Sequence, residues 1–151
     1  MRLFYYLFIT FILISCSNNV ELIFDEDNGG LFLPTGFQSL VVHEGVGQSR
    51  HIAVNENGDI YVKLRLDYGR KGNVALRDKN GDGKADIIQR FGDYPNDGRF
   101  ATEMKINEGY LYYSSERVVY RQKLSSKKLI PDSPVEVILT DPFPIRWHNA
   151  K

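Results

Sequence analysis

A pattern of alternating apolar and polar residues occurs twice in this chain, and it limits the fold more than any other feature. The first copy, RHIAVNENGDIYVKLR, alternates on both sides of an Asn57-Gly58 turn. The second copy begins at Met104, reads MKINEGYLYY and is one residue shorter at its turn. Alternation that is broken by a short Gly-containing turn predicts a β-hairpin with one apolar face. The repetition predicts a protein built from repeated antiparallel sheets.

Each hairpin is followed by two more segments of strand character. In the first copy Val74 and Leu76 mark a third strand, and residues 86–91 mark a fourth. In the second copy we align residues 118–121 with 73–76, and residues 135–139 with 86–91. The interval from Ile52 to Met104 is close to the roughly 40 to 50 residues of a four-stranded propeller blade. We therefore predict two β-propeller blades, blade one at about 38–92 and blade two at about 100–140.

Two blades do not close a propeller. Closure takes at least about four blades, because fewer leave sheet edges and apolar blade faces in water. The final segment, 141–151, begins like a loop that leads into another first strand. The fold that we predict is therefore all-β, with the first two blades of an incomplete propeller, the start of a third, and a longer parent protein.

Composition agrees with this fold class and excludes one class of partner. The chain of 151 residues contains nine Tyr and nine Phe, which favour strands. Its 19 basic and 19 acidic side chains balance, so no net charge attracts it to nucleic acid, and we expect no nucleic-acid partner. The single cysteine excludes an internal disulfide.

The N-terminus has the anatomy of an export signal. A basic start, Met1-Arg2, precedes an apolar run at 3–14 that is too short to span a bilayer comfortably. The run ends in Leu-Ile-Ser-Cys, which resembles the lipobox of bacterial lipoproteins, in which the cysteine is acylated and becomes the N-terminus. We expect a signal helix at 1–15, a lipidated tether at 16–32 that begins with Cys16, and a domain at 33–151. The alternative is an ordinary secretory signal with an incidental cysteine.

This N-terminal anatomy predicts an exported protein, anchored to a membrane through Cys16 on the periplasmic or cell-surface side. Within the tether, Asp25-Glu26-Asp27 is expected to be a solvated acidic run rather than a metal site. His43 and His51 lie at predicted strand edges without ligand partners at metal spacing, so we expect both to be structural or solvent-facing.

The segment DKNGDGKAD, at 78–86, is the candidate metal site. Its candidate ligands are Asp78, Asn80, Asp82 and Asp86. The first three, followed by Gly83, match the first six positions of an EF-hand loop, and oxygen ligands that alternate around a Gly turn suit Ca²⁺. Gln89 stands where a bidentate Glu would close the coordination, and the flanks are strand-like. We therefore expect weak calcium binding, with a simple polar hairpin loop as the alternative.

Four stretches carry a resemblance to a known family: LPTGFQSLVVHEG, SRHIAVNENGDIYVKLR, GNVALRDKNGDGKADIIQRFG and the terminal WHNAK. Together they resemble the N-terminal part of the PQQ-dependent sugar dehydrogenases of the sorbosone and aldose dehydrogenase type. The resemblance covers roughly residues 33–151, and the hairpin and the Asp-rich loop are its most specific pieces. It implies a six-bladed β-propeller outside the cytoplasm, with PQQ and calcium in its central depression.

The same resemblance implies a catalytic role for His148. In that family a His at the start of a blade strand takes the proton from the anomeric hydroxyl of the sugar, and His148 stands at the matching position. The residues that hold PQQ would come from later blades. We expect the parent protein to oxidise an aldose or a sugar aldehyde. The rival hypothesis is a non-catalytic, calcium-stabilised propeller lipoprotein that binds glycans or a protein partner.

Overall fold

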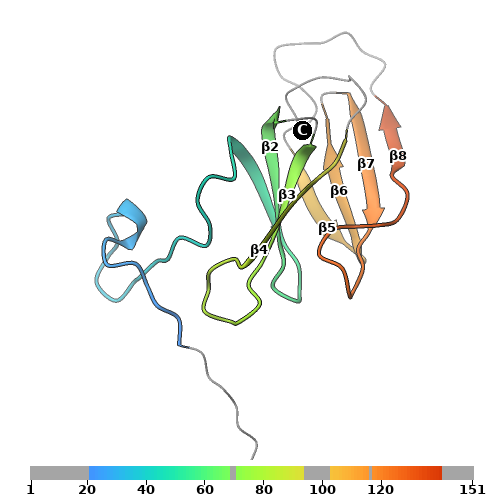
Figure 1. Cartoon of the computed structure of the whole chain (residues 1–151). Helices are drawn as coiled ribbons and strands as arrows, with labels where there is room; N and C mark the ends of the chain where they lie inside the picture. Colours follow the sequence, from blue (N-terminus) through green and yellow to red (C-terminus); the bar gives the residue numbers. More distant parts are fainter. Residues whose placement is uncertain (1–20, 69–70, 94–102, 116, 141–151) are drawn as a thin grey trace, which may run out of the picture.

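The computed structural model describes residues 21–68, 71–93, 103–115 and 117–140 (Figure 1). These residues form eight strands and one short 3₁₀ turn, η1 (Asn28–Gly30). The strands are β1 (Ser49–Val54), β2 (Ile60–Tyr68), β3 (Lys71–Arg77), β4 (Ile87–Phe91), β5 (Met104–Asn107), β6 (Tyr110–Ser114), β7 (Val118–Lys123) and β8 (Glu136–Thr140). The predicted all-β character is confirmed.

The strands form two antiparallel four-stranded sheets, one after the other along the chain (Figure 1). Strands β1 to β4 make the first sheet and β5 to β8 make the second, each in sequence order. Both predicted hairpins are present, with Val54 opposite Ile60 and Asn107 opposite Tyr110. The second hairpin turns through Glu108 and Gly109, both at positive φ (48° and 76°), a backbone twist that matches twisted antiparallel strands.

The two sheets share one register. Across the first sheet a row of facing residues consists of Ile52, Val62, Val74 and Arg90. Across the second sheet the row consists of Met104, Tyr113, Tyr120 and Val137. Tyr120 is therefore the equivalent of Val74, and the sequence alignment, which set Tyr120 against Ala75, was one residue out. The adjacent Val118 and Val119 gave no alternation to fix the phase of that strand. The repeated unit is compatible with a partial propeller.

The core lies between the two sheets. It joins Tyr61, Ala75 and Phe91 of the first sheet to a set from the second unit: Met104, Leu111, Tyr113, Tyr120 and Leu129. The Tyr61 hydroxyl donates to the Leu129 carbonyl at 2.9 Å, and burial raises the pKa of Tyr61 to about 12, so the hydroxyl stays a donor. The Tyr61 and Phe91 rings meet edge to face at 6.2 Å. Strands β1 and β5, the first of each sheet, lie in contact.

The other face of the first sheet is only partly covered. Val62, Leu64, Val74 and Leu76 are buried there against Val46 of the N-terminal segment and Ala85. Figure 1 shows this segment, in blue to teal, on the side of the first sheet away from the second sheet. Exposed apolar side chains remain at the two edges of this face, Ile52 (60%) and Val54 (59%) on β1 and Ile88 (40%) on β4.

Candidate functional site

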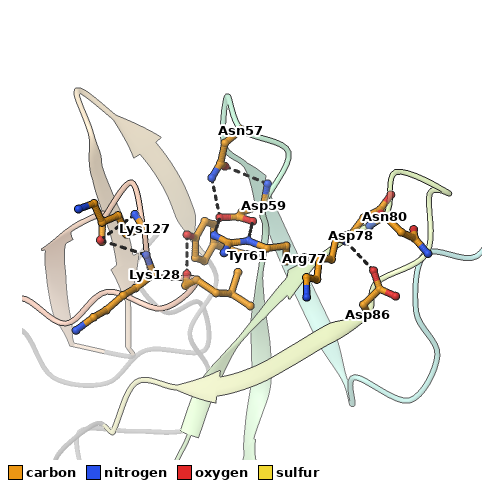
Figure 2. A network of polar contacts seen from close by, with 12 residues as sticks. Asn57, Asp59, Tyr61, Arg77, Asp78, Asn80, Asp86, Lys127 and Lys128 are labelled. Carbon is orange, nitrogen blue, oxygen red and sulfur yellow. Dashed lines mark hydrogen bonds and ion pairs between the residues drawn. The ribbon is translucent and has the colours of Figure 1, made fainter. Parts of the chain in front are cut away.

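The loop between β3 and β4 contains the four predicted calcium ligands, of which Figure 2 labels Asp78, Asn80 and Asp86. The oxygens of Asp78 accept hydrogen bonds from the loop's own backbone. Oδ1 of Asp78 accepts from the N–H groups of Asn80 and Gly81 at 3.1 and 2.6 Å, and Oδ2 accepts from Gly83 at 2.7 Å. Partial burial opposes ionisation, but these backbone hydrogen bonds hold the pKa of Asp78 below its ordinary 3.8. A carboxylate has about four acceptor sites, so Asp78 is largely occupied.

The remaining candidate ligands also accept bonds from within the loop. Asp82 accepts from Lys84 N–H at 2.8 Å and from the Asn80 side-chain amide at 3.0 Å. Asp86 accepts from the N–H of Lys79 at 2.7 Å. Within the part of the chain that the structure describes, no three His, Cys, Asp or Glu side chains are grouped to hold a metal ion.

In the conformation described, the oxygens of this donor set accept hydrogen bonds from the loop's own amides. Calcium binding by Asp78, Asn80, Asp82 and Asp86 therefore stays a prediction, and it requires several of these hydrogen bonds to rearrange.

An ion pair between a buried carboxylate and a partly buried guanidinium lies at the base of this loop, and the sequence analysis missed it. Asp59, 1% exposed, receives two hydrogen bonds from Arg77, from Nε and Nη2, each at 2.6 Å (Figure 2). The Asn57 side chain donates to the same carboxylate at 2.9 Å. The hydrogen bond to Asp59 raises the pKa of Arg77 above its ordinary value. The pair ties the β1–β2 turn to the residue that precedes Asp78.

The opposite charges of Asp59 and Arg77 are visible in the sequence, but their pairing could be predicted only from the register between β2 and β3. Ile60 faces Leu76, which places Asp59 and Arg77 at the next positions outward. Opposite charges at facing positions of neighbouring strands are a stabilising pair. The sequence analysis assigned no register between β2 and β3, so it did not bring Asp59 and Arg77 together.

The N-terminal segment is attached to the Asp-rich loop through Asp25. The Asp25 carboxylate accepts from the N–H of Val41 and, at 3.0 Å, from Nζ of Lys84. The hydrogen bond from Val41, followed by that from Lys84, lowers the pKa of Asp25. Asp25 is thus a bonded residue, and the prediction of a solvated run was wrong at this position. The residues next to Asp25 in the sequence could not show that its partner is Lys84, which is 59 positions away.

Close packing joins the same two segments. The N–H of Ala85 donates to the Val42 carbonyl at 2.8 Å. A Cβ on Gly83 would lie 2.7 Å from the Leu40 side chain and 2.9 Å from that of Leu22, so a larger residue would push both side chains aside, and the φ of +90° also favours glycine. The loop between β3 and β4 is therefore a docking point for the N-terminal segment.

A cavity of about 580 Å³ opens between the N-terminal segment and the loop. Its polar lining includes Asp25, Asp27, His43, Glu44 and Lys84. The volume is in the range of small-molecule pockets, but such pockets are mostly apolar, and the charged groups here include the Asp25–Lys84 pair. His43, which was predicted to be structural or solvent-facing, lines this cavity. His51 is partly exposed, with Nε2 3.6 Å from Glu103.

Two predicted site residues, Cys16 and His148, lie outside the described residues, so the lipidation and the catalytic base stay predictions. The predicted boundaries of signal, tether and domain stay predictions as well. Among the described residues there is no helix long and apolar enough to cross a membrane. Comparison of the chain with protein-family models, with curated proteins and with solved structures finds no match.

PQQ is a quinone with several carboxylates that needs cations around it, and two cations of the first sheet already have partners. Lys63 is buried and donates to the Gly72 carbonyl at 3.1 Å, and Arg77 is held by Asp59. We therefore assign no described residue to PQQ and derive no step through it.

We predict that Asp59→Asn destabilises the fold by about 1–3 kcal/mol, because Arg77 keeps its charge and loses its partner in a mostly buried place. Glu136→Gln is the matched control, since it removes the exposed partner of Arg121 and should cost less than about 1 kcal/mol. Urea unfolding at neutral pH measures both. Equal losses would contradict the structural role of the Asp59–Arg77 pair.

We also predict a pH dependence that arises from Asp78. Since its folded pKa lies below 3.8, the charged carboxylate stabilises the fold at neutral pH, and this contribution disappears as the pH falls through the folded pKa. The melting temperature of the wild type should therefore decrease more steeply below about pH 4 than that of Asp78→Asn. Asn80→Ala removes loop hydrogen bonds without removing a titrating group, and should keep the wild-type slope. If the melting temperatures of Asp78→Asn and the wild type fell in parallel with pH, the Asp78 carboxylate would not be the source of the pH dependence.

Proposed function

We propose that this chain provides the first two blades of an exported β-propeller of the PQQ-dependent sugar dehydrogenase type, which oxidises an aldose or a sugar aldehyde. One observation carries the blade arrangement: two consecutive four-stranded sheets repeat one register, and their first strands, β1 and β5, are in contact. Propeller blades are arranged around a central channel. Contact between the first strands of successive sheets supports such an arrangement.

The chemistry that we propose for this chain rests on His148, and it comes from the resemblance of the sequence. As a neutral imidazole, His148 would accept the proton of the sugar hydroxyl that is oxidised, a role that suits a group titrating near neutral pH. The resemblance implies PQQ, which residues of later blades would hold and which would supply the two-electron acceptor for this oxidation. Cys16 would anchor the protein to the membrane on the side outside the cytoplasm, where its sugar substrate is found.

A second function has one specific observation in its favour. The Asp-rich loop is bonded to itself through Asp78 and to the N-terminal segment through Lys84 and Asp25. A loop that connects segments in this way suits a calcium-stabilised, non-catalytic propeller that binds a glycan or a protein. Fold alone does not decide between these functions.

We predict that the full-length parent, supplied with PQQ and Ca²⁺, reduces a redox dye with aldoses, and that His148→Ala lowers the rate by about 10²- to 10⁴-fold. His51→Ala is the control, since His51 is partly exposed and lies beside Glu103, and it should keep the wild-type rate. An unchanged rate in His148→Ala would remove this residue as the base. No dye reduction by the wild type would favour the non-catalytic function.

Calcium binding is tested by titration of the chain that begins after Cys16. We expect Ca²⁺ to raise the melting temperature of the wild type and to release or absorb heat, and Asp82→Ala to abolish both effects. Mg²⁺ at the same concentration is the control ion, since it prefers a smaller, octahedral site. If neither heat nor a change in melting temperature appears, the loop is a turn without a metal.

A further inference from the structure

The N-terminal segment contains a loop that exposes large apolar side chains. Residues 29–38, which we call the apolar loop, read GGLFLPTGFQ and contain no charged residue. Phe32 is fully exposed, and Leu31 and Phe37 are exposed by 58% and 68%. Surface loops are usually polar, and a group of exposed apolar side chains marks a contact with a partner or with a membrane.

Hydrogen bonds at its base hold the apolar loop in shape. The N–H of Ser39 donates to the side-chain oxygen of Asn28 at 3.1 Å, and the Ser39 hydroxyl donates to the Asn28 carbonyl at 2.6 Å. Within the loop, the N–H of Phe37 donates to the Pro34 carbonyl at 3.1 Å. A loop whose two ends are joined can present its side chains in a defined arrangement. The exposed apolar side chains therefore belong to a closed loop.

The base of the apolar loop is also attached to the first sheet. The N–H of Asp25 donates to the Ser39 carbonyl at 3.1 Å, and its carboxylate accepts from Nζ of Lys84 at 3.0 Å. The N–H of Ala85 donates to the Val42 carbonyl at 2.8 Å. Figure 1 shows the blue turn η1, where the loop begins, at the end of the molecule farthest from the second sheet. The loop is thus an attached projection at that end.

The covalent chain keeps the start of this segment close to the predicted lipid anchor. Glu21, the first described residue, is the fifth residue after Cys16. Each residue spans at most about 3.6 Å, so the two residues lie within about 18 Å of each other in any conformation. An acylated Cys16 lies at the membrane surface. The anchored protein would therefore have the start of the segment that carries the apolar loop at that surface.

The charges of the segment indicate which kind of membrane contact it suits. Residues 17–42 contain four carboxylates and no Lys, Arg or His. Attraction to anionic lipids depends on clustered Lys and Arg near the membrane. The contact that fits this segment is therefore hydrophobic insertion into a lipid surface without net charge.

We propose that the apolar loop inserts Leu31, Phe32 and Phe37 into the interface of the membrane to which Cys16 anchors the protein. The anchor belongs to the proposed function, so this inference rests on that function. Insertion removes the three side chains from water. Because the base of the loop is bonded to the first sheet, insertion would also set the orientation of that sheet at the membrane.

The first test places a fluorescent probe in the loop of the acylated full-length parent. The protein is reconstituted in phosphatidylcholine vesicles whose acyl chains carry bromine, which quenches Trp fluorescence. Phe32→Trp adds one Trp to those of the wild type, and a Trp ring suits the membrane interface. We expect the added fluorescence to be quenched. Lys127→Trp, at an exposed site of the second unit, is the control, and its added fluorescence should remain.

Quenching of Phe32→Trp that is no stronger than that of Lys127→Trp would overturn the proposal. This is also the result expected if a later part of the parent covers the loop.

The second test measures the loop without the lipid anchor. The parent that begins at Ser17 is sedimented with phosphatidylcholine vesicles, and its partition coefficient is determined. The double variant Leu31→Ser/Phe32→Ser should lower this coefficient at least about 10-fold, because two large apolar side chains no longer leave water. Phe32→Trp should keep it. The coefficient should be the same at about 50 and about 500 mM salt, because the segment has no basic residue for salt to screen.

An unchanged coefficient in the double variant, or a coefficient that falls sharply at high salt, would overturn the proposal. Failure of the proposed function has separate readouts. Mass spectrometry of the purified parent shows whether Cys16 carries acyl chains, and the dye-reduction assay tests His148. Vesicle binding by the chain that begins at Ser17 depends on neither.

Discussion

The packing of the Tyr61 face of the first sheet on the Met104 face of the second is the contact on which the rest of the structure depends. Neither sheet has a complete core alone, since Tyr61, Phe91, Leu111 and Tyr113 are buried only between them. A four-stranded sheet has two faces, and each apolar face that stays in water weakens folding. The same contact brings β1 and β5 together, an arrangement that is compatible with two successive blades of a partial propeller.

Polar groups organise the end of the first sheet at which the Asp-rich loop begins. The Asp59–Arg77 pair fixes the start of this loop, Asp78 closes it around its own backbone, and Asp25 binds the N-terminal segment to Lys84. A buried carboxylate is tolerated because Arg77 and Asn57 supply its hydrogen bonds. The acidic residues that looked like metal ligands in the sequence are thus structural in this conformation, and a calcium role would be added to that structural role.

Much of the fold followed from the sequence, because alternation and Gly turns act locally. The hairpins at Asn57-Gly58 and Glu108-Gly109 and the repeat of four strands were predicted from such signals. The predicted alignment of β7 was one residue out, because two adjacent valines, Val118 and Val119, do not show which side chains point to which face of the sheet. Long-range partners could not be predicted: Asp25 and Lys84 meet only through the path of the N-terminal segment. The predicted His148 and Cys16 lie outside the described residues, so their roles rest on sequence patterns alone.

The central claim, that the two sheets are successive units joined through unlike faces, is tested most directly by nuclear Overhauser contacts in the labelled chain. The account predicts contacts of the Tyr61 and Phe91 rings with the Met104 and Leu111 methyl groups, which belong to one core. It also predicts that Ile52, on the opposite face of the first sheet, has no contact with Met104. Contacts between Ile52 and Met104, in the absence of those from Tyr61, would show that like faces are packed together and would contradict the account.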